Sequence, residues 1–226
     1  GRIFDANIFF PAAGTLAYSD HLILPALLAW PLWAATGHLV FCYNALLFFS
    51  WWAGALSMYL FAREATGSRP GALLAGLAWG FWPGRPAHFL HLQLQALYFL
   101  PLAFYFLHRV IAARRRRDAV GLGAAAALQG IASVYWGVIG AVGLAVAAIV
   151  LTAVAGRWRA RMARRLALAA LVGTVLIAPA VWPYWQAQRR EGFSRNLYEA
   201  SRHAATPASY LRVPPGNAVW GTSGRA

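Results

Sequence analysis

The sequence is short of acidic residues, of cysteine and of lysine. Only six of its 226 residues are acidic, all 20 basic residues are arginine, and the net charge is +14. The single cysteine, Cys42, excludes an internal disulfide and a cysteine metal site within the chain. Charged residues make up 12% of the chain, about half of what a soluble domain carries. These shortages argue against an ordinary soluble enzyme.

Long apolar runs take the place of the missing charge. Hydrophobic residues make up 60% of the chain, and the mean hydropathy is +0.52. Several runs approach the ~20 apolar residues that cross a bilayer core. The arginines lie in short hinges between these runs rather than along one polar face. This placement argues against nucleic-acid binding and favours contact with anionic lipid headgroups.

The pattern of runs and hinges predicts an all-α, polytopic membrane protein with about six transmembrane helices. Arginine-rich hinges at 63–69, 114–117 and 157–165 alternate with hinges rich in aromatic residues and histidine. The positive-inside rule places the arginine-rich hinges in the cytoplasm and the others outside. The predicted spans are 39–62, 71–82, 90–113, 119–134, 136–155 and 166–185. The second is short, so we expect it either to extend toward His88 or to kink at Pro83 and Pro86.

Three regions follow from this topology. Residues 1–37 are predicted to form an external first loop, residues 38–185 the transmembrane domain, and residues 186–226 an external tail or the start of a following region. Within the first loop, Pro25 and Pro31 interrupt a short apolar run, so we expect a helix that lies on or dips into the outer leaflet. The chain begins without an initiator Met and ends in polar sequence, which is expected of a fragment.

Two acids, Asp5 and Asp20, lie in otherwise apolar and aromatic segments of the first loop. Desolvating a carboxylate at a membrane surface is unfavourable, so each is expected to have a partner or a chemical role. Ser19 and Asp20 lie just before the apolar run from Leu22, and an N-cap of that helix is the alternative to a catalytic role for Asp20.

A second cluster of polar residues follows Trp82. Arg85 is a fixed cation that suits a phosphate group. His88, His91 and Gln95 are spaced i, i+3, i+7, which predicts one shared helical face able to bind a phosphate or sugar hydroxyls, or to carry protons. Together with His21, the two histidines could also form a zinc site. Interfacial histidines that hydrogen-bond to neighbouring loops are the simpler alternative.

Aromatic residues gather at the same predicted external face. Most of them are expected to anchor the protein at the membrane interface, and some could stack on sugar rings or line a groove for a lipid chain. The aromatic residues concerned are Trp79, Phe81, Trp82, Tyr135, Trp136, Trp182, Tyr184 and Trp185.

Several of these segments together resemble bacterial polytopic membrane proteins related to GT-C-type glycosyltransferases. The resemblance covers most of the chain. Its matching segments are residues 4–11, 16–21, 43–44, 72–82, Arg85, His88, 91–93, 101–102, 133–135, 183–184 and 192–195.

The resemblance implies transfer of a sugar from a polyprenyl-phosphate donor on the periplasmic face of a bacterial inner membrane. Asp20, or alternatively Asp5, would deprotonate the acceptor hydroxyl or hold a divalent cation. The expected partners are membrane lipid and the lipid-linked donor. The residues expected to bind the substrate are His21, Arg85, His88, His91, Gln95 and Tyr135.

Two other functions remain open on the sequence. A transporter or channel subunit would place polar residues near the bilayer midplane. Mid-span positions here are nearly all apolar, with exceptions such as Asn44, Ser50, Gln129 and Thr174. A non-catalytic membrane scaffold would show the same sequence pattern as the enzyme.

Overall fold

The computed structural model describes most of the chain as helix. Residues 1–187 and 188–226 form two compact units. The predicted all-α fold is confirmed for the described part, whose regular elements are all helical. Residues 114 and 157–159 of the predicted basic hinges and 212–226 of the predicted tail lie outside the described residues. The described residues are 3–112, 115–154, 160–194, 196–202 and 204–211.

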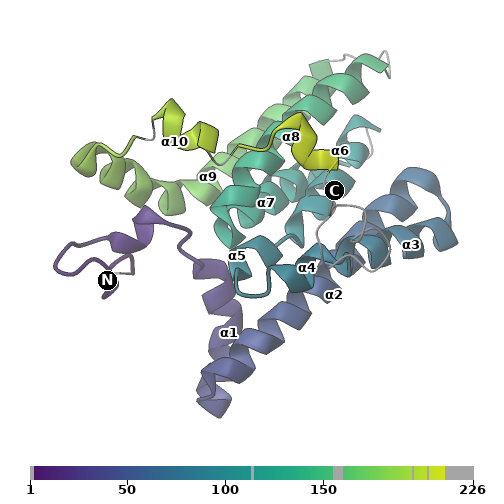
Figure 1. The fold of residues 1–226 in the computed structure, drawn as a ribbon. Helices are drawn as coiled ribbons and strands as arrows, with labels where there is room; N and C mark the ends of the chain where they lie inside the picture. The colour runs from purple at the N-terminus through teal and green to yellow at the C-terminus, as the bar shows by residue number, and fades with distance from the viewer. Residues whose placement is uncertain (1–2, 113–114, 155–159, 195, 203, 212–226) are drawn as a thin grey trace. The chain divides into compact units, whose positions relative to one another are not determined.

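The first unit contains one 3₁₀ helix and a series of α-helices (Figure 1). The last of them, α9, ends at Glu191, so the predicted tail from Gln186 begins as helix. The elements are η1 (Thr15–Tyr18), α1 (Ile23–Thr36), α2 (Leu39–Thr66), α3 (Arg69–Gly80), α4 (Gly84–Ala87), α5 (Leu92–Gln95), α6 (Phe99–Ile111), α7 (Arg116–Ala132), α8 (Val134–Val154) and α9 (Ala160–Glu191). The second unit contains α10 (Leu197–Arg202) and η2 (Pro207–Leu211).

Four helical segments of the described residues are long and apolar enough to cross a membrane. They are α2, the segment Leu92–Ile111 that contains α5 and α6, α8 and α9. Length and composition therefore support four of the six predicted spans. The other two correspond to α3 and α7. The 12 residues of α3 cover only ~18 Å of a ~30 Å core. The 17 residues of α7 begin with two arginines and an aspartate and continue mostly with alanine and glycine.

The short helix α3 is defined by its ends. The hydroxyl of Ser68 accepts a hydrogen bond from the Gly71 N–H at 3.1 Å, which caps the helix start, and Pro70 occupies the first turn. At the other end the chain leaves the helix before Pro83, which begins a new turn into α4. The predicted extension of this span toward His88 is therefore wrong.

Small residues allow the helices of the first unit to pack closely. Helices α2 and α3 lie side by side (Figure 1). A Cβ atom added at Gly80 would lie 2.6 Å from the Cβ of Ala55, so only glycine fits there. The α7–α8 pair meets in the same way, because a Cβ at Gly137 would lie 2.6 Å from the Cα of Gly130. Small residues at these positions let the helix backbones approach closely.

The best-packed part of the first unit lies among α6, α7 and α9. Its buried side chains include Leu107, Val110, Leu122 and Ala169. Helix α1 contributes less, since of its residues only Pro25 is buried. Its 14 residues form the short apolar helix expected in the first loop.

Candidate functional site

Three segments that are far apart in the sequence meet in the first unit. We call them the aromatic rim: residues 3–22, 83–95 and 133–136. The Asp20 carboxylate accepts a hydrogen bond from the Val134 N–H at 2.7 Å. The Trp136 indole N–H donates to the Leu94 carbonyl at 3.2 Å. The turn between α7 and α8 therefore connects the first loop to the segment after α3.

Asp5 closes the first loop on itself. Its Oδ1 atom accepts a hydrogen bond from the Gly14 N–H at 2.7 Å, and the Leu16 N–H donates to the Phe4 carbonyl at 3.0 Å. Gly14 has a φ of 73°, a left-handed conformation that glycine adopts without strain. The structure thus gives Asp5 a role in shaping the loop, and its catalytic role stays a prediction.

Asp20 caps a helix, but not the one that follows it in sequence. The N-cap position of α1 is Leu22, with a φ of 49°, and no side chain of that residue can accept a bond. The free N–H of Ile23 donates instead to the His21 ring at Nδ1, at 3.0 Å. The predicted cap of the following helix is therefore wrong. Asp20 reaches the first N–H of α8, 114 residues later, where a carboxylate also interacts favourably with the helix dipole.

His21 is a buried, neutral imidazole. Its side chain is 6% exposed and lies edge-on to the ring of Phe4 and tilted against that of Tyr184, both 5.8 Å away. Burial lowers the pKa of His21, against a smaller opposite effect of Asp20. Since Nδ1 accepts a hydrogen bond, the ring proton is on Nε2, which has no acceptor among the described residues. His21 can therefore donate one hydrogen bond to a ligand.

Tyr184 brings α9 to the first loop. Its hydroxyl donates to the Ser19 carbonyl at 2.6 Å, and its ring lies edge-on to Phe4 at 6.2 Å. The sequence suggested only an interfacial aromatic residue here. A contact across 165 residues leaves no periodic signal, so sequence reasoning missed the position of Tyr184 beside His21.

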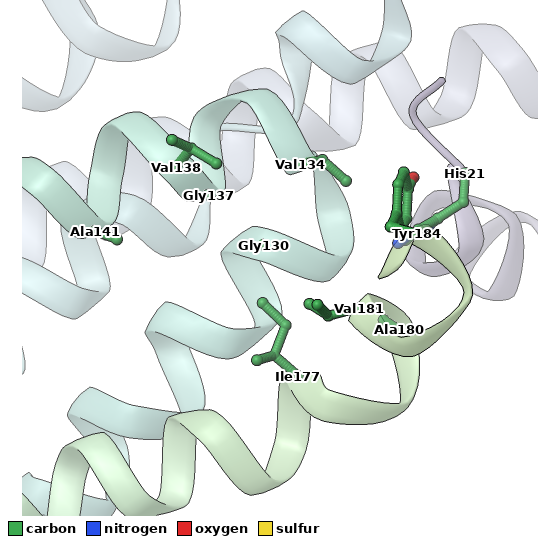
Figure 2. A pocket seen from close by; sticks show the side chains of 10 residues that line it. All are labelled: His21, Gly130, Val134, Gly137, Val138, Ala141, Ile177, Ala180, Val181 and Tyr184. Atoms are coloured by element: carbon green, nitrogen blue, oxygen red, sulfur yellow. The ribbon is translucent and has the colours of Figure 1, made fainter. Parts of the chain in front are cut away.

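An apolar pocket of about 370 Å³ begins at these two side chains. Figure 2 shows His21 and Tyr184 together at one end, with aliphatic side chains from α8 and α9 along the rest and Gly130 of α7 beside them. Gly130 and Gly137 lie where α7 and α8 approach most closely. The remaining lining residues are Val134, Val138, Ala141, Ile177, Ala180 and Val181. A hydrocarbon chain that carries one polar group fits this combination.

Arg85 is not the open phosphate-binding cation that the sequence predicted. Its side chain is 2% exposed, and burial lowers its pKa to about 10. Its guanidinium donates to the Trp79 carbonyl at 3.2 Å and to the Gln95 carbonyl at 2.9 Å. No acidic side chain of the described residues pairs with it. Arg85 therefore holds the backbone of the rim together from inside.

Gln95 completes this arrangement. Its amide nitrogen donates to the carbonyls of Arg85 and His88, at 3.0 and 2.9 Å, and its amide oxygen accepts from the Trp51 indole at 2.9 Å. Gln95 is 1% exposed, so it too cannot reach an external substrate. We call the Arg85–Gln95 pair the rim latch, because it fixes segment 83–95 against α2.

The predicted shared face of His88, His91 and Gln95 is wrong. Helix α4 ends at Ala87 and α5 begins at Leu92, so both histidines lie in a turn between helices. They are exposed, with ring centres 6.3 Å apart. His88 contacts the Gly84 carbonyl at 2.9 Å, as expected of a histidine bonded to its own loop.

The zinc alternative gains no support from the geometry. The described residues contain no group of three His, Cys, Asp or Glu side chains placed to hold a metal ion. His21 packs against aromatic rings instead.

Tyr135 is 55% exposed and lies edge-on to Trp136, next to the Val134 N–H that Asp20 caps. It remains available for a ligand at the rim.

The segment Leu92–Ile111 is interrupted between α5 and α6, and Gln129 of α7 fills the gap. Its amide nitrogen donates to the Ala96 carbonyl at 2.6 Å, and its amide oxygen accepts from the Leu100 N–H at 2.9 Å. One buried side chain therefore bonds a carbonyl and an N–H at the break. Gln129 thus has a structural role.

The comparisons with known proteins leave the function to be argued from this geometry. Neither a family model, nor a curated protein, nor a solved structure matches the chain significantly.

Proposed function

We propose that the chain forms the membrane domain of a glycosyltransferase that uses a polyprenyl-phosphate sugar donor. The observation that supports this proposal is the apolar pocket that ends at His21 and Tyr184, one residue from Asp20. The pocket would hold part of the polyprenyl chain, and the phosphate and sugar would lie at the aromatic rim. The positive-inside rule would put that rim on the periplasmic side of a bacterial inner membrane.

The rim offers the groups that glycosyl transfer requires. One oxygen of Asp20 is bonded to Val134, and the other is the proposed base that takes the proton of the acceptor hydroxyl. The acceptor oxygen forms the new bond to the sugar, and the bond from the sugar to the donor phosphate breaks, its electron pair leaving with the phosphate. The His21 Nε2–H would donate to the phosphate oxygen that gains charge.

The other predicted substrate residues take different roles in this proposal. Arg85 and Gln95 are positioning residues, because their side chains are buried in the rim latch. His88, His91 and Tyr135 are exposed at the rim and would contact the sugar or the acceptor. A divalent cation bound to Asp20 is an alternative way to activate the acceptor.

Sugar transfer in membranes that contain the complete protein tests the proposal. The measurement compares radiolabelled polyprenyl-phosphate sugars with wild type, Asp20→Asn and Asp5→Asn. Asparagine keeps an oxygen for the Val134 N–H but cannot accept the proton, so we expect transfer to fall at least about 100-fold in Asp20→Asn. Loss in Asp5→Asn alone would move the base to Asp5. An absence of transfer from every donor would contradict the proposal.

The interrupted segment Leu92–Ile111 favours transport as the alternative function, because transporters bind their substrates at broken helices. Here Gln129 already bonds the Ala96 carbonyl and the Leu100 N–H at the break. A non-catalytic scaffold would also explain why Asp5 and Asp20 each bond a backbone N–H. The transfer assay separates the scaffold from the enzyme.

A further inference from the structure

A second cavity lies far along the first unit from the aromatic rim, where α7 and α9 begin. Its volume is about 480 Å³, and the described residues that line it are four arginines and one leucine, with no acidic side chain among them. We call this cavity the arginine pocket. It is lined by Arg116, Arg161, Arg164, Arg165 and Leu168.

The placement of these arginines is electrostatically unfavourable without a ligand. Arg116 is the first residue of α7, and the other three lie in the first two turns of α9. The N-terminus of a helix carries a partial positive charge, so cations there are destabilising. Helix α9 has no acidic residue in its first turn to compensate. An anion between the two helix starts would relieve both the dipole interaction and the repulsion among the guanidinium groups.

The nearby acids are already engaged with another arginine. Asp118 accepts a hydrogen bond from Arg109 Nε at 2.9 Å and a second from the Arg115 N–H at 2.9 Å. The same guanidinium lies 3.4 Å from Glu64. Arg109 therefore forms ion pairs with Glu64 of α2 and with Asp118 of α7. Neither acid lines the arginine pocket.

Arg165 enters the pocket without a partner of its own. Its Nη1 atom is enclosed by protein and has no acceptor among the described residues. An enclosed guanidinium N–H without an acceptor is unfavourable by about 1–3 kcal/mol, and more for a charged group. Arg164 has only a 3.4 Å contact from Nε to the Ala160 carbonyl one turn earlier. The guanidinium groups of these arginines can thus donate hydrogen bonds to the oxygen atoms of a ligand.

We propose that the arginine pocket binds a phosphate group. The planar guanidinium group of arginine can pair with two phosphate oxygens at once, and four arginines line this one cavity. The phosphate would come from an anionic phospholipid headgroup or from free phosphate. Leu168 provides an apolar wall next to the arginines, as the start of an acyl chain would need. This inference does not depend on the proposed glycosyl transfer.

Lipid binding to the complete protein, purified in detergent and followed by native mass spectrometry, tests the proposal. The probes are phosphatidylglycerol, phosphatidylcholine and inorganic phosphate. The variant Arg161→Gln/Arg164→Gln removes two exposed charges of the pocket, and Arg63→Gln/Arg69→Gln removes two outside it. Each arginine near an anionic lipid contributes about fivefold in affinity, so we expect about 25-fold weaker phosphatidylglycerol binding in the first variant and little change in the second.

The probes also identify the source of the phosphate. Binding of phosphatidylglycerol, without competition from millimolar inorganic phosphate, would assign a lipid headgroup. Binding of inorganic phosphate with the same dependence on the two variants would assign free phosphate. Equal binding by wild type and Arg161→Gln/Arg164→Gln, or an equal loss in both double variants, would overturn the proposal. Arg116→Gln on α7 repeats the test from the other helix if the double variant fails to fold.

Discussion

Arg85 at the aromatic rim and the arginines where α7 and α9 begin offer a direct comparison. Arg85 is 2% exposed and donates to two carbonyl oxygens of its own chain. Arg161 and Arg164 are exposed and line a cavity with no acidic residue. The difference shows that one residue type has opposite uses in this chain. A buried guanidinium fixes the backbone, whereas an exposed group of them is left available to an anion.

The comparison extends to the polar partners in each region. Around segment 83–95 and the break before α6, two glutamine side chains bond buried polar groups: Gln95 bonds three partners and Gln129 bonds two. Near the arginine pocket, carboxylates do so, because Arg109 holds both Glu64 and Asp118. Rigid geometry is therefore expected at the rim, and sensitivity to salt and charge at the pocket.

The largest effect on stability is expected from breaking the rim latch. Gln95→Leu keeps a similar volume but leaves the Trp51 indole and the carbonyls of Arg85 and His88 without their partner. Unsatisfied buried groups are unfavourable by about 1–3 kcal/mol each, with partial relaxation, so we expect a loss of about 3 kcal/mol. Denaturant or thermal unfolding in detergent measures it.

Gln93→Leu is the matched control for this prediction. Gln93 is half-buried two residues away, and no hydrogen bond of its side chain is present in the structure. We expect its replacement to change stability by less than about 0.5 kcal/mol. Equal effects of the two substitutions would mean that the latch contributes nothing beyond the burial of its side chains.

A smaller effect on stability is expected at the other end of the first unit. There, replacing the ion-paired Arg109 should cost more stability than replacing an arginine that lines the pocket. Arg109→Gln removes the partner of two partly buried carboxylates, and we expect a loss of about 2 kcal/mol. Arg116→Gln removes an exposed pocket arginine and is expected to leave stability unchanged, or to raise it slightly where no anion is bound. Unfolding measurements at low and high salt compare them. A larger loss in Arg116→Gln than in Arg109→Gln would reverse the proposed assignment.

The smallest effect concerns the pH dependence at the rim. Burial lowers the folded-state pKa of His21 below its unfolded value of about 6.5. The unfolded chain then binds the proton more readily, so the contribution of His21 to stability is present above pH 6.5 and is lost as the pH falls toward the folded-state pKa. The slope cannot exceed about 1.4 kcal/mol per pH unit. Unfolding at pH 7 and pH 5 should show a steeper acid loss in wild type than in His21→Gln; parallel losses would contradict the assignment.

The sequence predicted helices better than it predicted what their side chains contact. Apolar runs located α2 and α8 closely, because a membrane helix needs an uninterrupted apolar stretch. The same reasoning counted α3 and α7 as spans, but α3 has only 12 residues, and most of the small residues of α7 are buried against other helices. Small apolar residues are compatible with both situations, so composition alone could not separate them.

The contacts of the predicted site residues differ from those that the sequence pattern suggested. The helical spacing of His88, His91 and Gln95 assumed an unbroken helix, but the turn before Leu92 separates them. Asp20 was recognised as a helix cap, yet its partner lies on α8. Tyr184 and Ser19 meet across 165 residues. Such long-range partners follow from tertiary packing, and no local pattern in one sequence encodes them.

The bond between Asp20 and Val134 links the two halves of the proposed site thermodynamically. Val134 gives its N–H to the Asp20 carboxylate, and its side chain lines the apolar pocket. A ligand that displaces Val134 on entering the pocket therefore also changes the free energy of holding the carboxylate in place. Such coupling is reciprocal: if an apolar chain in the pocket weakens the bond between Asp20 and Val134, then that bond weakens the binding of the chain by the same factor. A substitution at Asp20 should therefore change the affinity for an apolar chain.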